Sequence, residues 1–393
     1  MKVVFDTREL YFLTQYLPVW RVLRRRGVEC AFACYHNRPT QLAAMQNAVA
    51  RAGLPARWFV TKEEGLAWYR SEPPDWIVFG NGYGLLAELA PETRTAQLYH
   101  GIGTKTDVYS PTLMQMDVRF IEGPHYERRL RTLYPEANLQ AVGYAKVDPL
   151  YYPEGERPRL DLAALRLDPE KQTILYAPTH MPSSFPRMAN EFPADFADFN
   201  VLVKPHSLSF FGGKKRSHRR LMELWSRAPN VHVASFDEYD PLPYMTAADL
   251  LISDESSVLF EFAVQDRPIV WCDFLWVHWT RRGPLAYRLR RRLDASIDPY
   301  RSMAAHAPRY RDLRRIVDEE LADPGRYREA RRSCVEALIG PTDGKVAERI
   351  ADCLERDTSA GGWVSAASGA PGRRTGLSRR GADAFVHSDS PPP

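Results

Sequence analysis

The sequence predicts an α/β protein of two doubly wound, Rossmann-like domains that face a central cleft, with a disordered tail after the second domain. Three observations lead to this prediction. The chain has 393 residues, enough for two domains that each bury a core. Strand patterns alternate with helix patterns, which is typical of parallel sheets covered by helices. A stretch rich in proline and charge interrupts this alternation after residue 150.

The first domain is expected at residues 1–150. The apolar run at 2–5 predicts a strand, the periodicity of 10–27 predicts a helix, and 29–35 predicts the next strand. A second helix is expected at 41–53. Further strand candidates follow along the chain: ARWFV, DWIVFG, TAQLYH, VRFIEG and LQAVGY. Alternation of this kind predicts a parallel, doubly wound sheet.

A linker is expected at residues 151–170 and the second domain at 171–356. In chain order, the expected elements of this domain are a strand in QTILYAPTH (172–180), a strand in FNVLVKPHS (199–207), a basic helix near 214–227, a strand in VHVAS (231–235) and closing helices near 309–355. Residues 357–393 are biased in composition and low in hydrophobic periodicity, which predicts the disordered tail.

The segment DLLISDESSVLFEFAVQDRPIVWCD, at 249–273, predicts a strand, a polar turn, a helix and another strand. The turn would lie at the carboxyl end of a parallel strand, where phosphate groups bind. Ser256 and Ser257 can offer hydroxyls and amides to phosphate oxygens. Asp254 is expected at the same donor site, where its carboxylate can hold the turn by accepting backbone amides. Glu261 can accept hydroxyls from a ribose or polyol, with a surface salt bridge as the alternative.

A histidine follows another predicted strand in QLYHGIGTK, at 97–105. Histidine titrates near neutral pH, so His100 can take a proton from a hydroxyl. Gly101 lets the backbone approach a ligand, and Lys105 supplies a positive charge near an acceptor or a phosphate. The alternative is a histidine that only caps a turn.

Two more strand ends carry polar side chains. Thr179 and His180 follow the strand in ILYAPTH, and Lys204, His206 and Ser207 follow the strand in LVKPHS. In open α/β sheets, ligands bind outside the carboxyl ends of the strands. A ligand is therefore expected in the crevice between the two domains.

Composition narrows the class of protein. Hydrophobic residues make up 44% and charged residues 26% of the chain, as in ordinary globular proteins. The net charge of +4 is too small to indicate a nucleic-acid partner. Basic clusters at 21–27, 214–220, 280–283 and 287–293 would suit an anionic membrane surface or a polyanionic acceptor, although such clusters are more often solvated helix faces.

The sequence lacks the motifs of several common classes of enzyme. No Walker loop, GxGxxG fingerprint or GxSxG elbow is present, and the spacing of histidines and cysteines fits no metal site. The five scattered cysteines predict free thiols in a reducing compartment. Neither a signal peptide nor an apolar stretch of membrane-spanning length is visible. The expected location is therefore cytoplasmic, or at most peripheral on the inner face of the cell membrane.

Taken in order, YHGIGTK, YAPTH, LVKPHS and DLLISDESSVLFEFAVQDRPIV resemble the CDP-glycerol glycerophosphotransferase family, which includes teichoic acid primases and polymerases. The resemblance covers roughly residues 75–352, and GPTDGKVAERI at 340–350 is similar to the closing helix of the family. It implies a GT-B transferase that moves a polyol phosphate from a CDP-activated donor to a hydroxyl of a surface glycan or lipid-linked precursor and releases CMP. It implies no metal and no other cofactor.

The resemblance also implies roles for individual residues. His100 matches the candidate base that deprotonates the acceptor hydroxyl. His206, Ser207 and the paired serines at 256–257 match residues that would hold the donor pyrophosphate and offset charge on the departing CMP. Thr179 matches another donor contact.

The chain departs from the family pattern at four positions. His180 and Met181 stand where the family commonly has an aromatic residue and an arginine, Glu255 where it often has tyrosine, and Tyr99 where it has tryptophan. Two alternatives therefore stay open: a GT-B glycosyltransferase or epimerase that uses a UDP-sugar or another sugar nucleotide, and a binding protein without activity. The acceptor, the number of units added and the oligomeric state also stay open.

Overall fold

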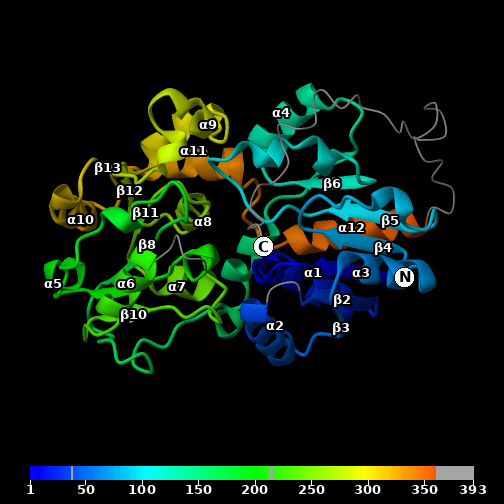
Figure 1. Cartoon of the computed structure of the whole chain (residues 1–393), viewed down its shortest axis with the longest axis horizontal. Coiled ribbons are helices and arrows are strands. Elements are labelled where there is room, and N and C mark those ends of the chain that lie inside the picture. The colour runs from blue at the N-terminus through cyan, green and yellow to red at the C-terminus, as the bar shows by residue number, and fades with distance from the viewer. Residues whose placement is uncertain (37–38, 212–215, 360–393) are drawn as a thin grey trace.

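Two parallel sheets lie side by side in the computed structural model, which describes residues 1–36, 39–211 and 216–359 (Figure 1). The first sheet has the strand order β3-β2-β1-β4-β5-β6-β7, and the second has the order β10-β9-β8-β11-β12-β13. Every strand pair in both sheets is parallel. The predicted architecture of two doubly wound domains is confirmed. Most of the predicted tail, residues 360–393, lies outside the described residues.

The first sheet and four of the helices that accompany it come from the first 141 residues. The strands are β1 (Lys2–Thr7), β2 (Glu29–Tyr35), β3 (Ala56–Phe59), β4 (Trp76–Phe79), β5 (Arg94–Gln97), β6 (Val118–Ile121) and β7 (Leu139–Ala141). The helices are α1 (Leu13–Arg25), α2 (Pro39–Ala52), α3 (Lys62–Ser71) and α4 (Pro124–Leu133). The 3-10 helix η5 (Ala145–Tyr151) leads from β7 towards the second sheet.

The second sheet begins at β8. Its strands are β8 (Thr173–Ala177), β9 (Asn200–Val203), β10 (Val231–Val233), β11 (Leu250–Ser253), β12 (Ile269–Cys272) and β13 (Ala305–Ala307). The helices after the linker are α5 (Phe192–Asp195), α6 (Arg216–Trp225), α7 (Leu242–Ala247), α8 (Val258–Ala263), α9 (Tyr287–Arg290), α10 (Leu313–Ala322), α11 (Arg328–Leu338) and α12 (Val346–Ser359).

Central strands of both sheets are apolar on both faces, as expected for parallel strands covered by helices. Val3, Val4 and Phe5 of β1 have no exposed surface, and neither do Ile252 of β11 and Leu175 of β8. The chain order changes direction at β1 and β4 in the first sheet and at β8 and β11 in the second. Each sheet therefore has a crevice at the carboxyl ends of its central strands, where doubly wound proteins bind ligands.

The last helix packs on the first sheet, although the predicted division placed residues 346–356 in the second domain. Its apolar face joins the core that contains Val3 and Phe5, and the Trp76 Nε1–H donates to the Leu354 carbonyl at 3.1 Å. Figure 1 shows α12 beside α1 and β4. The Asp148 carboxylate accepts the amides of the first turn of α12, which fixes where the helix starts. We propose that the first domain includes α12.

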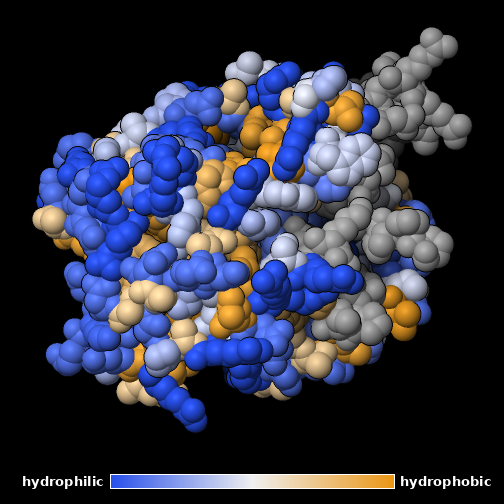
Figure 2. Space-filling view, turned by 60° about the vertical axis from the view of Figure 1, so that its left-hand side comes forward, coloured by the Kyte–Doolittle hydropathy of each residue, from blue (hydrophilic) through white to orange (hydrophobic). Residues whose placement is uncertain are grey.

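The surface carries few large apolar side chains. The face seen in Figure 2 is mostly hydrophilic, with small hydrophobic patches between charged groups. No helix in the described part of the chain is long and apolar enough to cross a membrane. All five cysteines are unbridged. Of the predicted basic clusters, residues 214–215 lie outside the described residues.

Candidate active site

A cavity of about 230 Å³ lies between the carboxyl ends of the two sheets and is lined from both. The first domain contributes the loop 99–105, which follows β5. The second domain contributes residues 177–179 after β8, 204–207 after β9 and 255–258 after β11. The strand-end motifs predicted from the sequence therefore meet in one place, because parallel strands of each sheet end at the same edge.

Three aromatic rings hold His100. Its ring centroid lies 5.0 Å from that of Tyr11, 5.3 Å from that of Phe12 and 4.6 Å from that of Tyr99. Its Nδ1 lies 3.2 Å from the carbonyl oxygen of Gly80. A carbonyl oxygen only accepts, so Nδ1 carries the proton. The lone pair of the neutral ring is then on Nε2, which is the form a general base needs.

The surroundings keep His100 neutral. Burial lowers its pKa from 6.5 to about 4; the bond to Gly80 opposes this shift, and the charges of Lys105 and Lys146 add to it. The imidazole is therefore unprotonated at neutral pH. A phosphate group bound near the two lysines would offset their charge and raise the pKa again.

His206 has the opposite tautomer. Its Nδ1 accepts the amide hydrogen of Leu208 at 3.1 Å, so a neutral ring carries its proton on Nε2. His206 is therefore a donor where His100 is an acceptor. His180 packs against it, with ring centroids 4.5 Å apart, and supports the His206 ring from outside the cavity lining.

Lys204 supplies the cation after β9. Burial lowers the pKa of its ammonium from 10.5 to about 8; the carboxylates of Asp240 and Glu238 oppose this shift, and Lys146 adds to it. The nitrogen lies 5.9 Å from the ring centroid of Tyr244. The group is still mostly charged at neutral pH and lines the cavity, so it can bind a phosphate.

Asp254 does not line the cavity, in contrast to the prediction of a donor contact. Its carboxylate is fully buried and accepts the amides of Thr179 and Ser184, each at 2.7 Å, and the hydroxyl of Ser184 at 2.8 Å. The Ser183 hydroxyl adds a contact at 3.3 Å. Asp254 thus ties the loop after β8 to the turn after β11 and places Thr179 beside the serine pair.

Glu261 is also buried away from the cavity, so it does not reach a ribose or polyol in this structure. The Lys146 ammonium lies 2.9 Å and 2.8 Å from its two carboxylate oxygens, and the Tyr144 hydroxyl donates to it at 3.0 Å. Glu261 therefore holds Lys146, which does line the cavity. The pair joins η5 to α8 across the two domains.

Gly103 allows the two domains to touch beside the site. Its φ of +110° is unfavourable for other residues, and a Cβ there would lie 2.5 Å from the Phe260 ring on α8. Its amide donates to the Tyr126 hydroxyl at 2.8 Å. The loop that carries His100 is thereby fixed against the helix that follows Ser256 and Ser257.

The structure brings together most of the predicted site residues. Those that line the cavity are His100, Gly101, Lys105, Thr179, Lys204, His206, Ser207, Ser256 and Ser257. His180, Asp254 and Glu261 stand behind it. Lys146 was missed, although it follows the strand in LQAVGY and the strand-end rule would have found it. No group of three potential metal ligands occurs among the residues that the structure describes.

A model of the CDP-glycerol:poly(glycerophosphate) glycerophosphotransferase family matches residues 115–356. The chain belongs to this family. Membership makes it a phosphotransferase and confirms the predicted family; the sugar-nucleotide alternative is not favoured. The match covers all the motifs of the second domain and begins after the His100 loop. A comparison with curated proteins gives no match.

Solved structures share the fold. The wall teichoic acid polymerase TagF superposes with a TM-score of 0.65 at 15% identity, covering 92% of this chain and 89% of that one. UDP-GlcNAc 2-epimerase from Neisseria meningitidis superposes with a TM-score of 0.55 at 12% identity, covering 91% and 100%. These likenesses confirm the predicted GT-B fold.

Proposed function

We propose that the protein transfers a polyol phosphate, with CDP-glycerol as the first candidate donor, to a hydroxyl of a glycan or lipid-linked acceptor. The observation that carries this proposal is the pair of histidines with opposite tautomers. His100 presents a lone pair from the first domain, whereas His206 and Lys204 present donors from the second. A base facing a set of phosphate ligands is the arrangement that phosphoryl transfer to a hydroxyl requires.

In the proposed step, the acceptor hydroxyl gives its proton to His100 Nε2. Its oxygen forms a bond to the β-phosphorus of the donor, in line with the bond between that phosphorus and the bridging oxygen. The bridging bond breaks, its electron pair stays on CMP, and the product is a phosphodiester. Rate enhancement comes from positioning the hydroxyl and from fixed donors around the phosphates.

The second domain holds the donor in this proposal. The hydroxyls of Thr179, Ser256 and Ser257 and the Nε2–H of His206 are directed to phosphate oxygens, with Lys204 as a cation. The helix after the serines, α8, has only six residues, so its dipole contributes less than the hydroxyls and amides of the turn. Ser207, Lys105 and Gly101 also line the cavity.

We also propose weak, peripheral binding to an anionic membrane through residues 279–291. Trp279 is 71% exposed and Tyr287 is 40% exposed, and the same segment contains Arg282, Arg288 and Arg290 at the surface. Exposed aromatic rings with arginines suit the interface of an anionic bilayer. Vesicle sedimentation at low and high salt tests this proposal, because binding that does not weaken with salt contradicts it.

The test of the transferase is CMP release from CDP-glycerol, measured with CDP-ribitol and UDP-sugars beside it. His100→Ala should abolish transfer while calorimetry shows CDP-glycerol binding intact. His36→Ala is the matched control, because His36 packs on Trp58 outside the cavity. Full activity of His100→Ala would refute the proposal that His100 is the general base. Turnover of a UDP-sugar alone would show that the donor is a sugar nucleotide, and no CMP release from either CDP-alcohol would refute the proposed donor class.

A further inference from the structure

A second groove, of about 530 Å³, lies outside the cleft between the linker and the carboxyl ends of α7 and α8. Its lining, all within the described chain, includes Arg157, Arg159 and Arg267 and contains no carboxylate. Leu150 and Leu160 are among its apolar residues. A concave site with several guanidinium groups and aliphatic walls fits a flexible anionic chain better than it fits a flat surface.

Most of this positive charge is not neutralised by a buried acid. Arg267 donates to the carbonyls of Thr246 and Ala248, and Arg157 donates from Nε to the carbonyl of Tyr152. A backbone carbonyl orients a guanidinium group by accepting a hydrogen bond, but it is neutral and therefore does not cancel the positive charge. Arg159 does pair with a carboxylate, that of Glu154, at 2.8 Å, but the two side chains are 64% and 83% exposed, where ion pairs are weak.

A line of exposed arginines on α1 and α2 connects this groove to the cleft. Arg21 and Arg25 are exposed on α1, and α1 packs against η5, whose last residue, Tyr151, lines the groove. Tyr152 lies next to the groove, because its carbonyl accepts a hydrogen bond from Arg157, which lines the groove. At the other end, Arg51 of α2 donates to the carbonyl of Asp237 at 3.3 Å, and the nearby Phe236 and Tyr239 line the cleft.

We infer that these arginines form a track that binds the phosphodiester backbone of a poly(glycerophosphate) acceptor outside the cleft. Every phosphodiester carries a negative charge, and its glycerol methylenes would pack on the leucines of the groove. This inference rests on the proposed function, since it gives that reaction a polymeric acceptor. The track would favour acceptors that already carry several units, because a short acceptor fills the cleft and reaches no further.

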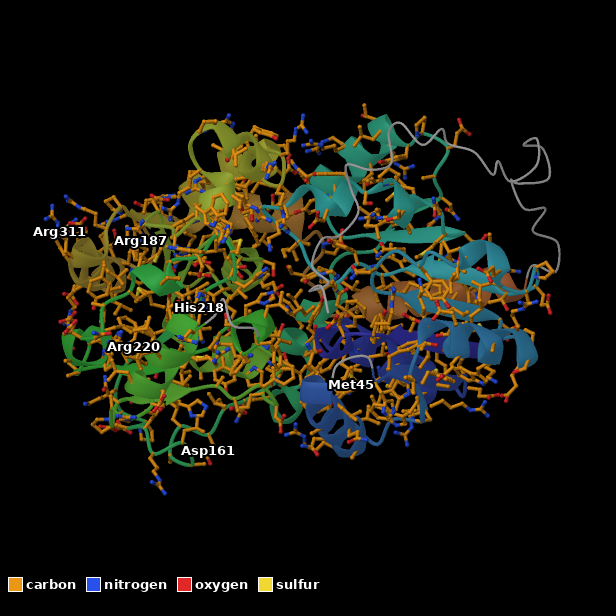
Figure 3. All side chains as sticks on the ribbon, in the orientation of Figure 1. Met45, Asp161, Arg187, His218, Arg220 and Arg311 are labelled. Carbon is orange, nitrogen blue, oxygen red and sulfur yellow. The ribbon has the colours of Figure 1, made fainter. Side chains whose placement is uncertain are left out.

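Acceptor length tests the track. Arg157→Glu with Arg159→Glu, and separately Arg21→Glu with Arg25→Glu, should leave the KM for an acceptor of one unit unchanged. For a long acceptor we expect the KM to rise roughly three- to tenfold, the size of a few exposed ion pairs. Arg220→Glu with Arg311→Glu is the matched control, because these arginines lie on the side of the second domain away from the first (Figure 3).

Glutamine versions of the same pairs should give a smaller rise, and unchanged thermal unfolding shows that the variants are folded. An equal rise for both acceptor lengths, or none for either, overturns the inference. Loss of vesicle binding with unchanged KM for long soluble acceptors overturns it in favour of a lipid surface.

Direct binding separates this inference from the proposed function. Calorimetry with soluble poly(glycerophosphate) and no donor should show binding that weakens with salt and weakens further in the glutamate variants. If the wild-type protein releases no CMP from any donor yet binds the polymer in this way, the transferase proposal fails and the track stands. If it transfers glycerol phosphate but binds no polymer, the track fails alone.

Discussion

The strongest test of the proposed site is its pH dependence, because burial shifts the pKa values of the proposed base and of the proposed phosphate-binding cation in directions that favour the same pH range. His100 must be neutral to accept a proton, and its pKa is lowered to about 4. Lys204 must be charged to hold a phosphate, and its pKa is lowered to about 8. The value of kcat/KM should therefore rise through pH 4, stay level, and fall through pH 8, since this parameter reports the free enzyme.

The expected change in rate can be calculated for the acid limb and for the alkaline limb of the pH profile. At pH 5 the rate should stay close to its value at pH 7, whereas a histidine with a pKa of about 6.5 would lower it about 25-fold. At pH 9 only about one-tenth of Lys204 is charged, so the rate should be about tenfold lower than at pH 7. Initial rates of CMP release at low donor concentration and constant ionic strength measure both limbs.

A substitution assigns the alkaline limb. Lys204→Arg should remove the fall near pH 8, because a guanidinium does not lose its proton in this range. Lys62→Arg is the matched control, since Lys62 is exposed on α3. An alkaline limb that stays at pH 8 in Lys204→Arg would refute the role of Lys204. A 25-fold loss at pH 5 would refute the lowered pKa of His100.

Three further substitutions test how the site is supported. Asp254→Asn replaces a carboxylate that accepts several hydrogen bonds with a side chain that has only one acceptor oxygen. Each backbone amide that loses its acceptor should lower the free energy of unfolding, measured with urea, by about 1–3 kcal/mol. An unchanged midpoint of unfolding would contradict the proposal that Asp254 ties the two loops together. Gly103→Ala places a Cβ against Phe260 at positive φ, and a loss of about 1–3 kcal/mol with weaker transfer is expected. Glu261→Gln removes the negative charge that balances the buried ammonium of Lys146, which should cost about 3–5 kcal/mol in the free energy of unfolding. A smaller loss, measured by urea denaturation, would show that the pair is already solvated.

Strand-end motifs were predictable because their geometry follows from the sheet. Any polar residue directly after a parallel strand lies at the edge of the sheet where the crevice forms. His100, Lys204 and Ser256 could therefore be predicted to lie close together, although no contact between them was known. The β2 strand was predicted with its observed ends, since its apolar run is bounded by Gly27 on one side and by polar residues in the sequence on the other. This prediction did not require the register of the strands within each parallel sheet.

Partners of buried charges were not predictable in the same way. Asp254 and Glu261 lie near the serine turn in the sequence, and sequence spacing alone cannot tell a side chain that lines a cavity from one that points behind it. The partner of Glu261 is Lys146, 115 residues earlier. The return of α12 to the first sheet depends likewise on Asp148 and on a core that only the folded domain presents.

The distribution of charge gives His100 a low affinity for protons and gives the cleft a positive site that suits the phosphates of a donor. Lys105 and Lys146 lower the pKa of His100 as long as no anion is present, so the imidazole has little affinity for a proton. A bound pyrophosphate would neutralise part of that charge and strengthen the base once the donor is in place. The acid limb of kcat should then lie at higher pH than the acid limb of kcat/KM, because kcat reports the complex. Coincident limbs would mean that the donor does not act on His100. A separation would mean that the acceptor hydroxyl is activated only after the donor has bound.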